Sequence, residues 1–421
     1  MSTTLSDAAA RLAAAFPATP PALGTPNPRC TAAPRGASPC LPRTAQRFST
    51  TTQLILRREP REGLFQVGTD GRHRWNPSTT GGVPMHLEAY LALGIPFAYL
   101  DEQFSPRLAS SLDELISLST ALTIQCLNQS IPLSIESVSS TRLDRFVRRS
   151  LGMPVLRHSR LIRLDADVEV NDKMESDFIS NGYEGNPDDI IRVVARRVFE
   201  KRAHEIMIAA NLSNVGSLEL VRMVSRCESS WKVYPETVGA LEIREAVIAS
   251  AKHQWPAMQR LGFGDVWAWL NRFSGFTTGF SNSQVGRALN AMTQIMNEKA
   301  LDMPLQLVWS MIGLEAIYCR RTEAVLEQLR DGSSLLLGTC PIRKLFNTMY
   351  DSRSKFLHGT MNFAGSDLLE DARDDVGKFD QSMAEASALA IAVLVATIQE
   401  LVVRGWTGVG FRYEVVPEVD K

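Results

Sequence analysis

The sequence of 421 residues lacks the short motifs that identify the common nucleotide and metal enzymes. It contains no phosphate-binding loop of the Gly-x-x-x-x-Gly-Lys-Ser/Thr type, no Gly-x-Gly-x-x-Gly dinucleotide fingerprint and no His-Glu-x-x-His pair. None of its six cysteines forms a Cys-x-x-Cys pair, so a zinc ribbon or a thioredoxin-like site has no support either. We therefore expect no cofactor and no metal ligands.

Long apolar runs and an excess of one charge are also missing. The most apolar run, residues 388–396, is about half as long as the roughly 20 residues that span a bilayer, which predicts a buried core helix and no membrane contact. The net charge of -1 excludes a uniformly basic nucleic-acid-binding surface but allows a local basic patch. Because the cysteines show no disulfide-type spacing, a reducing compartment is favoured, and we expect the protein in the cytoplasm.

Residues 1–50 are rich in Ala, Pro, Ser and Thr, and Asp7 is their only acid. A segment of this composition cannot bury enough apolar surface to offset its chain entropy, which predicts a disordered tail. The scarcity of acids is also typical of an organellar transit peptide, so a targeting segment remains an alternative.

From residue 51 to 233 the sequence predicts a domain that mixes strands and helices. Alternating apolar residues and turn residues predict strands over 53–57, 63–67, 131–138, 160–170 and 216–224. Helices are expected over 105–128 and from Pro187 to about Ala210, the second with Asn186 as its N-cap.

Beyond residue 234 the strand signals fade and the pattern becomes helical. Helices are predicted over 236–253, 263–273, 281–298, 304–321, 322–330, 341–358 and 367–403. We assign 234–280 to a helical connector, 281–412 to a helical bundle and 413–421 to a tail. The predicted fold class is therefore α+β, with an N-terminal mixed α/β domain followed by a C-terminal all-α bundle.

Two charged residues of the bundle lie where apolar residues are expected. Glu315 has Met311 and Tyr318 as helical neighbours, and Arg353 has Met349 and Leu357. A charge on an apolar stripe is unfavourable without a partner. We predict that Glu315 and Arg353 meet, or that both face one polar cleft between their helices.

The residues that follow Arg353 complete a polar segment at a helix end. Ser354, Lys355 and His358 are its polar members, and Gly359 is suited to the position just after the helix. Five residues of helix rotate His358 about 140° from Arg353. Both side chains reach one cleft only if the helix ends near Gly359 or a partner surface wraps around it.

These residues also carry a family resemblance. Leu314-Glu-Ala-Ile, followed by Met349-Tyr-Asp-Ser-Arg-Ser-Lys-Phe-Leu-His-Gly, resembles the ApeA-type branch of the HEPN superfamily over about residues 281–405. The resemblance implies a helical RNA-cleaving domain, usually a homodimer, that acts in anti-phage (abortive infection) defence or as a toxin. It maps the family's catalytic Arg and His onto Arg353 and His358, the following polar residue onto Ser354, and the family Glu onto Glu315. The N-terminal domain would then sense a phage-derived trigger or select the RNA.

The chemistry of these residues suits RNA cleavage without a metal ion. RNA carries its own nucleophile, the 2′-hydroxyl, so cleavage requires a base, an acid and stabilisation of the phosphorane charge. An imidazole exchanges protons near neutral pH, and a guanidinium stabilises the charge. One His per chain leaves one proton-transfer role open, which a dimer would fill. We expect Lys355 and Tyr350 to contact the RNA, for which tRNA is a candidate. A HEPN scaffold that binds a protein or nucleotide partner without cleavage is the alternative.

A second basic segment lies outside the bundle. Residues 141–163 contain seven arginines and one acid. We select Arg145, Arg148 and Arg149 as candidates for contacts with the RNA backbone, with a solvated face or interdomain contacts as the alternative. Trp267 and Trp269 begin an aromatic cluster that we expect to pack in the core.

Overall fold

The computed structural model describes residues 83–94, 101–118, 122–126, 129–170, 187–228, 230–234, 239–273, 281–297, 303–361 and 374–411. These residues all belong to one compact unit, Asn76–Lys421. The predicted tails, the predicted strands over 53–57 and 63–67, and the N-cap Asn186 lie outside the described residues. The described part combines helices with an antiparallel sheet, so the mixed α+β class is confirmed.

Five antiparallel strands form the main sheet, in the order β4-β5-β1-β6-β7. The central strand β1 (Val83–Gly94) pairs with β5 (Arg160–Val170) on one side and β6 (Glu219–Cys227) on the other. The edges are β4 (Ser134–Ser137) and β7 (Ser230–Tyr234). All neighbouring strands of this sheet pair antiparallel.

The smaller elements lie around this sheet. A separate two-stranded sheet consists of β2 (Thr123–Cys126) and β3 (Gln129–Pro132). The helices of this region are α2 (Asp101–Ser117), the 3-10 helix η3 (Ser140–Arg142), α3 (Arg145–Leu151), α4 (Met153–His158) and α6 (Pro187–Ser213).

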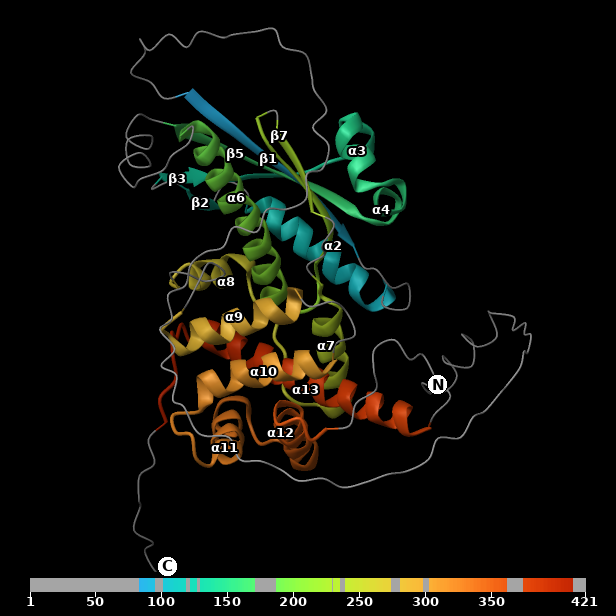
Figure 1. Ribbon diagram of the computed structural model, residues 1–421, viewed down its shortest axis with the longest axis vertical. Coiled ribbons are helices and arrows are strands. Elements are labelled where there is room, and N and C mark those ends of the chain that lie inside the picture. Colours follow the sequence, from blue (N-terminus) through green and yellow to red (C-terminus); the bar gives the residue numbers. More distant parts are fainter. Residues whose placement is uncertain are drawn as a thin grey trace, which may run out of the picture. The chain divides into compact units, whose positions relative to one another are not determined.

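The two faces of the sheet pack against different helices. On one face, Leu87, Leu91 and Leu164 join the main core, which also contains apolar residues of α2 and α6. On the other face, Ala92 and Val224 belong to a smaller core that includes residues of α3. Figure 1 shows α6 running along the sheet and α3 with α4 beside it.

Among the described residues, seven helices follow the sheet in the chain. They are α7 (Leu241–His253), α8 (Phe263–Leu270), α9 (Gln284–Asn297), α10 (Met303–Tyr318), α11 (Val325–Leu337), α12 (Arg343–Leu357) and α13 (Asp374–Val403). Each predicted helix corresponds to one of them, with shifts at several ends. Helix α7 starts later than the predicted residue 236, α8 and α10 end three residues before the predicted 273 and 321, and α11 starts and ends later than the predicted 322–330. Helix α13 packs against α7, α10, α11 and α12 and is the centre of this group (Figure 1).

Helix α13 corrects the prediction that no apolar segment of the chain is long enough to span a bilayer. Its segment Lys378–Val403 is long and apolar enough to cross a membrane, but 89% of the window that meets this criterion is buried inside the protein. The uninterrupted run in the sequence is short because buried polar residues divide it: Thr397 hydrogen-bonds to the Val393 carbonyl and Gln399 to the Leu212 carbonyl. The predicted core helix is confirmed by this burial.

The sheet region differs from the predictions in three further places. The sequence does not predict strand β1, because its Met, Leu, Ala and Glu residues are good helix formers. The segment forms a strand because it is buried on both faces of the sheet. The predicted helix over 105–128 stops at Ser117, and Thr123–Cys126 is strand β2. The predicted strand over 131–138 is divided between β3 and β4.

Candidate functional site

The two charged residues of the apolar stripes do meet. Arg353 of α12 donates a hydrogen bond from Nη2 to Oε2 of Glu315 on α10, at 2.9 Å. The two side chains are 20% and 22% exposed, so the pair is largely withdrawn from water. The prediction that each charge requires the other as its partner is confirmed.

The pair is not fully satisfied within the described residues. Oε1 of Glu315 and Nε of Arg353 are both buried, and neither has a hydrogen-bond partner among the residues that the structure describes. Burial raises the pKa of the Glu315 carboxyl, while the charge of Arg353 lowers it. Cys319, which directly follows the end of α10, has a thiol pKa raised to about 11, mainly by burial and secondly by Glu315. The site therefore keeps unused hydrogen-bonding capacity at both charged groups.

The end of helix α12 has the predicted form. Gly359 adopts a left-handed conformation with φ of 64°, its N–H donates to the Phe356 carbonyl, and the Thr360 N–H donates to the Lys355 carbonyl. This pair of bonds is the Schellman termination, which requires a residue without a Cβ at the left-handed position. His358 is the C-cap residue and its side chain is exposed.

The imidazole of His358 is not bonded to the charged pair within the described part of the chain. No hydrogen bond or ion pair among the described residues joins His358 to Arg353 or Glu315. Leu357 was expected on the buried stripe but is 50% exposed, because the last turn of α12 protrudes into solvent together with residues 358–360. The helix does end where the prediction required, and the exposed imidazole stands at that end.

The remaining candidates on α12 differ in accessibility. Ser354 is half-buried, and its carbonyl accepts the His358 N–H at 3.0 Å. Lys355 is exposed, and Tyr350 is half-buried and packs against the core. Lys355 and His358 are thus the polar groups of this segment that are open to a ligand, with Ser354 behind them.

The arginines of the second basic segment lie elsewhere. Arg145, Arg148 and Arg149 are exposed on α3, which packs against the sheet, whereas α12 packs against α10, α11 and α13. Arg148 already donates to the carbonyls of Thr141 and Leu143. These three arginines therefore form a surface separate from the Arg353 site.

One further member of the basic segment, Arg163, is neutralised by acids. Arg163 of β5 pairs with Asp165 at 2.7 Å and with Glu136 at 3.0 Å, and it lies 3.8 Å from Glu88. These acids come from three neighbouring strands, so only the sheet reveals that Arg163 is part of a salt-bridge network.

One group of possible metal ligands was missed. His86, Glu88 and Asp165 offer ligand atoms that lie within 4.8 Å of one another, and Arg226 forms an ion pair with Glu88 at 2.9 Å. The signal was absent from the sequence because two of these residues belong to β1, which was not predicted, and they face Asp165 only through the β1–β5 register. The predicted aromatic core is confirmed for Trp267 and Trp269, which are 6% and 2% exposed.

Comparison of the chain with models of protein families, with curated proteins and with solved structures gives no match.

Proposed function

We propose that this chain is a metal-independent endoribonuclease of the HEPN type. The observation that carries the proposal is the ion pair of Arg353 and Glu315, held between two helices beside a helix end that exposes His358. In this proposal, the helices after the sheet form a C-terminal all-α HEPN-type domain, and the sheet-containing part before them senses a trigger or selects the RNA. The family resemblance of the α10 and α12 segments supports the same assignment.

The proposed reaction uses the nucleophile that RNA carries. The 2′-hydroxyl oxygen attacks the adjacent phosphorus, the bond from phosphorus to the 5′-oxygen breaks, and the ends become a 2′,3′-cyclic phosphate and a 5′-hydroxyl. His358 takes the proton of the 2′-hydroxyl, and Arg353 stabilises the negative charge of the phosphorane. Glu315 holds the guanidinium in place through its Oε2 atom and takes no part in the attack.

A homodimer completes this reaction. The departing 5′-oxygen requires a proton, and the described part of one chain offers a single imidazole at this helix end. The partner subunit's His358 supplies that proton if the two exposed helix ends face each other across the RNA. Lys355, which is exposed beside His358, contacts the phosphate backbone in the same arrangement.

Cleavage of total RNA and of tRNA in the presence of EDTA tests the proposal. We expect cleavage by the wild type, and at least about a 100-fold loss in Arg353→Ala and His358→Ala, which is the usual size of a general acid–base or oxyanion contribution. Lys344→Ala is the matched control, since Lys344 is exposed on the same helix. Because His358 is exposed, its replacement should leave the unfolding temperature unchanged. Equal activity in all variants would overturn the site, and cleavage that requires a metal ion would overturn the mechanism.

The biological setting follows the resemblance and is tested separately. In a phage-challenged host, the wild type should protect the cells and Arg353→Ala should not. We place the protein in the cytoplasm, where it meets RNA and a phage-derived trigger. If Arg353→Ala still protects the cells, the defence does not depend on RNA cleavage at this site.

A non-catalytic HEPN scaffold is the second candidate. The observation that favours it is the lack of any bond between His358 and the charged pair among the described residues. Such a scaffold would bind a protein or nucleotide partner through the same helices. Sedimentation analysis separates the two functions, because a strict monomer is incompatible with the two-imidazole reaction, whereas a dimer that cleaves RNA rules out the scaffold.

A further inference from the structure

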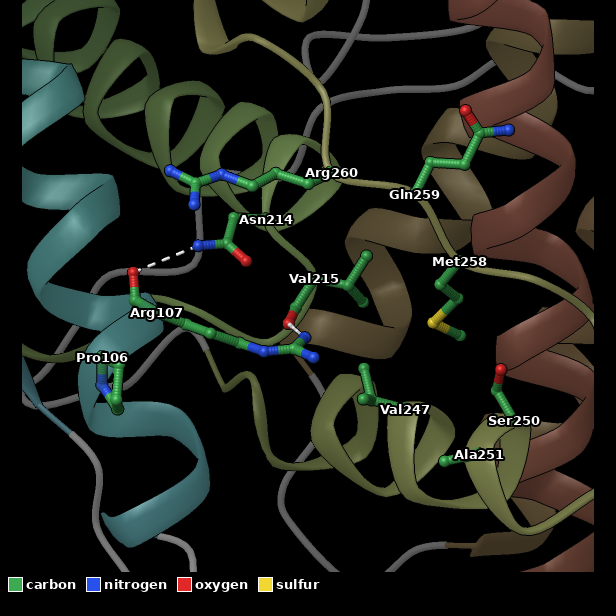
Figure 2. Close-up of a pocket in the computed structure, with 10 residues that line it drawn as sticks. All are labelled: Pro106, Arg107, Asn214, Val215, Val247, Ser250, Ala251, Met258, Gln259 and Arg260. Atoms are coloured by element: carbon green, nitrogen blue, oxygen red, sulfur yellow. Dashed lines mark hydrogen bonds between the residues drawn. The ribbon is translucent and has the colours of Figure 1, made fainter. Parts of the chain in front are cut away.

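A cavity far along the chain from the Arg353 site is lined by two arginines, and no acid lines it among the residues that the structure describes. Its volume is about 430 Å³, which lies within the range of small-molecule sites. Helix α2, the turn between α6 and β6, helix α7 and the segment before α8 contribute its walls. Figure 2 shows Arg107 extending from α2 towards Val215 and α7, and Arg260 extending from the segment before α8 back towards α2.

Arg107 has no carboxylate partner among the described residues. Its Nη1 donates to the Val215 carbonyl at 2.8 Å, and its guanidinium lies 5.2 Å from the centre of the Phe104 ring. Burial lowers the pKa of Arg107, and no neighbouring acid offsets this effect. Arg244, over the same ring, instead has Glu219 as a counter-ion at 2.8 Å. A half-buried guanidinium without a counter-charge is unfavourable unless an anion supplies one.

Arg260 brings a second positive charge to the same space. It hydrogen-bonds to Ser110 of α2, and no acid in the described part of the chain forms an ion pair with it. Asn214 lies between the two arginines, and its Nδ2 donates to the Arg107 carbonyl at 3.2 Å (Figure 2). The same group donates to the Ser111 hydroxyl at 3.1 Å. Val247 and Met258 add an apolar wall.

We propose that this cavity binds a small phosphorylated organic molecule, with its phosphate between Arg107 and Arg260 and its organic part against Val247 and Met258. A phosphate monoester carries a charge of about -1.5 to -2 at neutral pH, which matches two guanidinium groups. Guanidinium groups also bind phosphate oxygens through paired hydrogen bonds. This binding is separate from the proposed RNA cleavage, because no residue of α10 or α12 lines the cavity.

Isothermal titration of the full chain with AMP and with pyrophosphate, in EDTA and without RNA, tests the proposal. AMP should bind the wild type, and Arg107→Gln should bind it at least about tenfold more weakly. Ala251→Phe should weaken it similarly, because Ala251 is exposed at the cavity wall and a phenyl ring fills the space without touching the Arg107 hydrogen bond. Arg287→Gln is the matched control, since Arg287 is also bonded to a backbone carbonyl but lies on α9.

Three outcomes contradict the proposal. Equal affinity in the wild type, Arg107→Gln and Ala251→Phe would show that AMP binds elsewhere. No binding of either probe at about millimolar concentration would show that the cavity takes no phosphate. If pyrophosphate binds as tightly as AMP, the organic part of the ligand does not contribute to binding in this cavity. Arg353→Ala should bind AMP like the wild type, so a failure of the nuclease proposal leaves this result unaffected.

Discussion

The ion pair of Arg353 and Glu315 contributes a measurable share of the stability of the protein. Exposed ion pairs contribute about 0.2–1 kcal/mol, and breaking a fully buried pair costs about 3–5 kcal/mol. The partners lie 2.9 Å apart on different helices and are about one-fifth exposed, so the pair lies between these limits. We expect each of Arg353→Met and Glu315→Gln to lower the free energy of unfolding by about 2 kcal/mol, with a coupling energy of about 1.5 kcal/mol.

A double-mutant cycle measured by urea unfolding gives this coupling energy directly. The control pair is Arg404 and Glu400 of the α13 end, at 3.1 Å, where the arginine is 42% exposed. Such a pair should couple by no more than about 0.5 kcal/mol. A coupling energy for Arg353 and Glu315 that does not exceed the control would refute the conclusion that the site is desolvated.

The pH dependence of the same variants provides a second check. Burial raises the pKa of Glu315 and the charge of Arg353 lowers it, so Arg353→Met leaves only the raising cause. A carboxyl with a higher pKa in the folded than in the unfolded chain keeps its proton longer when folded, and the folded state loses stability as the pH rises past the ordinary carboxyl range. The free energy of unfolding of Arg353→Met should therefore be closer to that of the wild type near pH 5 than near pH 8. A difference in free energy of unfolding that stays the same at both pH values would contradict a raised pKa of Glu315 as the cause.

Three further predictions concern the core and the surface. Tyr318→Phe removes the buried hydrogen bond to Thr397 at 2.7 Å and should lower the free energy of unfolding by about 1 kcal/mol in urea; no change would mean that the hydroxyl contributes nothing. Gly332→Ala places a Cβ 2.5 Å from the Tyr318 ring and should cost about 1–3 kcal/mol, seen as a lower melting temperature, whereas a stabilised variant would refute the close packing. Lys252→Ala removes the main cause that lowers the pKa of Glu385. A carboxyl whose pKa is lowered by folding stabilises the folded protein at pH values above its ordinary pKa, and this stabilisation is lost as the pH falls. The substitution should lower the free energy of unfolding by less than about 1 kcal/mol at pH 7 and should have no effect near pH 3. An equal loss at both pH values would contradict the role of Lys252 in lowering the pKa of Glu385.

The sequence alone determined the helices after the sheet and the meeting of two charges within them. Both follow from the 3.6-residue period, which is local: a Glu or Arg on an apolar stripe is visible as an anomaly without knowing the fold. The end of α12 was equally predictable, because Gly359 is the residue type that the left-handed position requires. Strand β5 was predicted with its bounds from its alternating pattern.

Strand β1 and everything that depends on its register were decided by the tertiary structure. A strand rich in Leu and Ala looks like a helix until two neighbours pair with it, and strand pairing joins residues far apart in the chain. The cluster of His86, Glu88 and Asp165 exists only through that pairing. Arg107 is a further case: in sequence it is an ordinary charged residue of an amphipathic helix. Only the packing of α2 against α7 and the turn after α6 removes it from water without an acid beside it and leaves a cavity there.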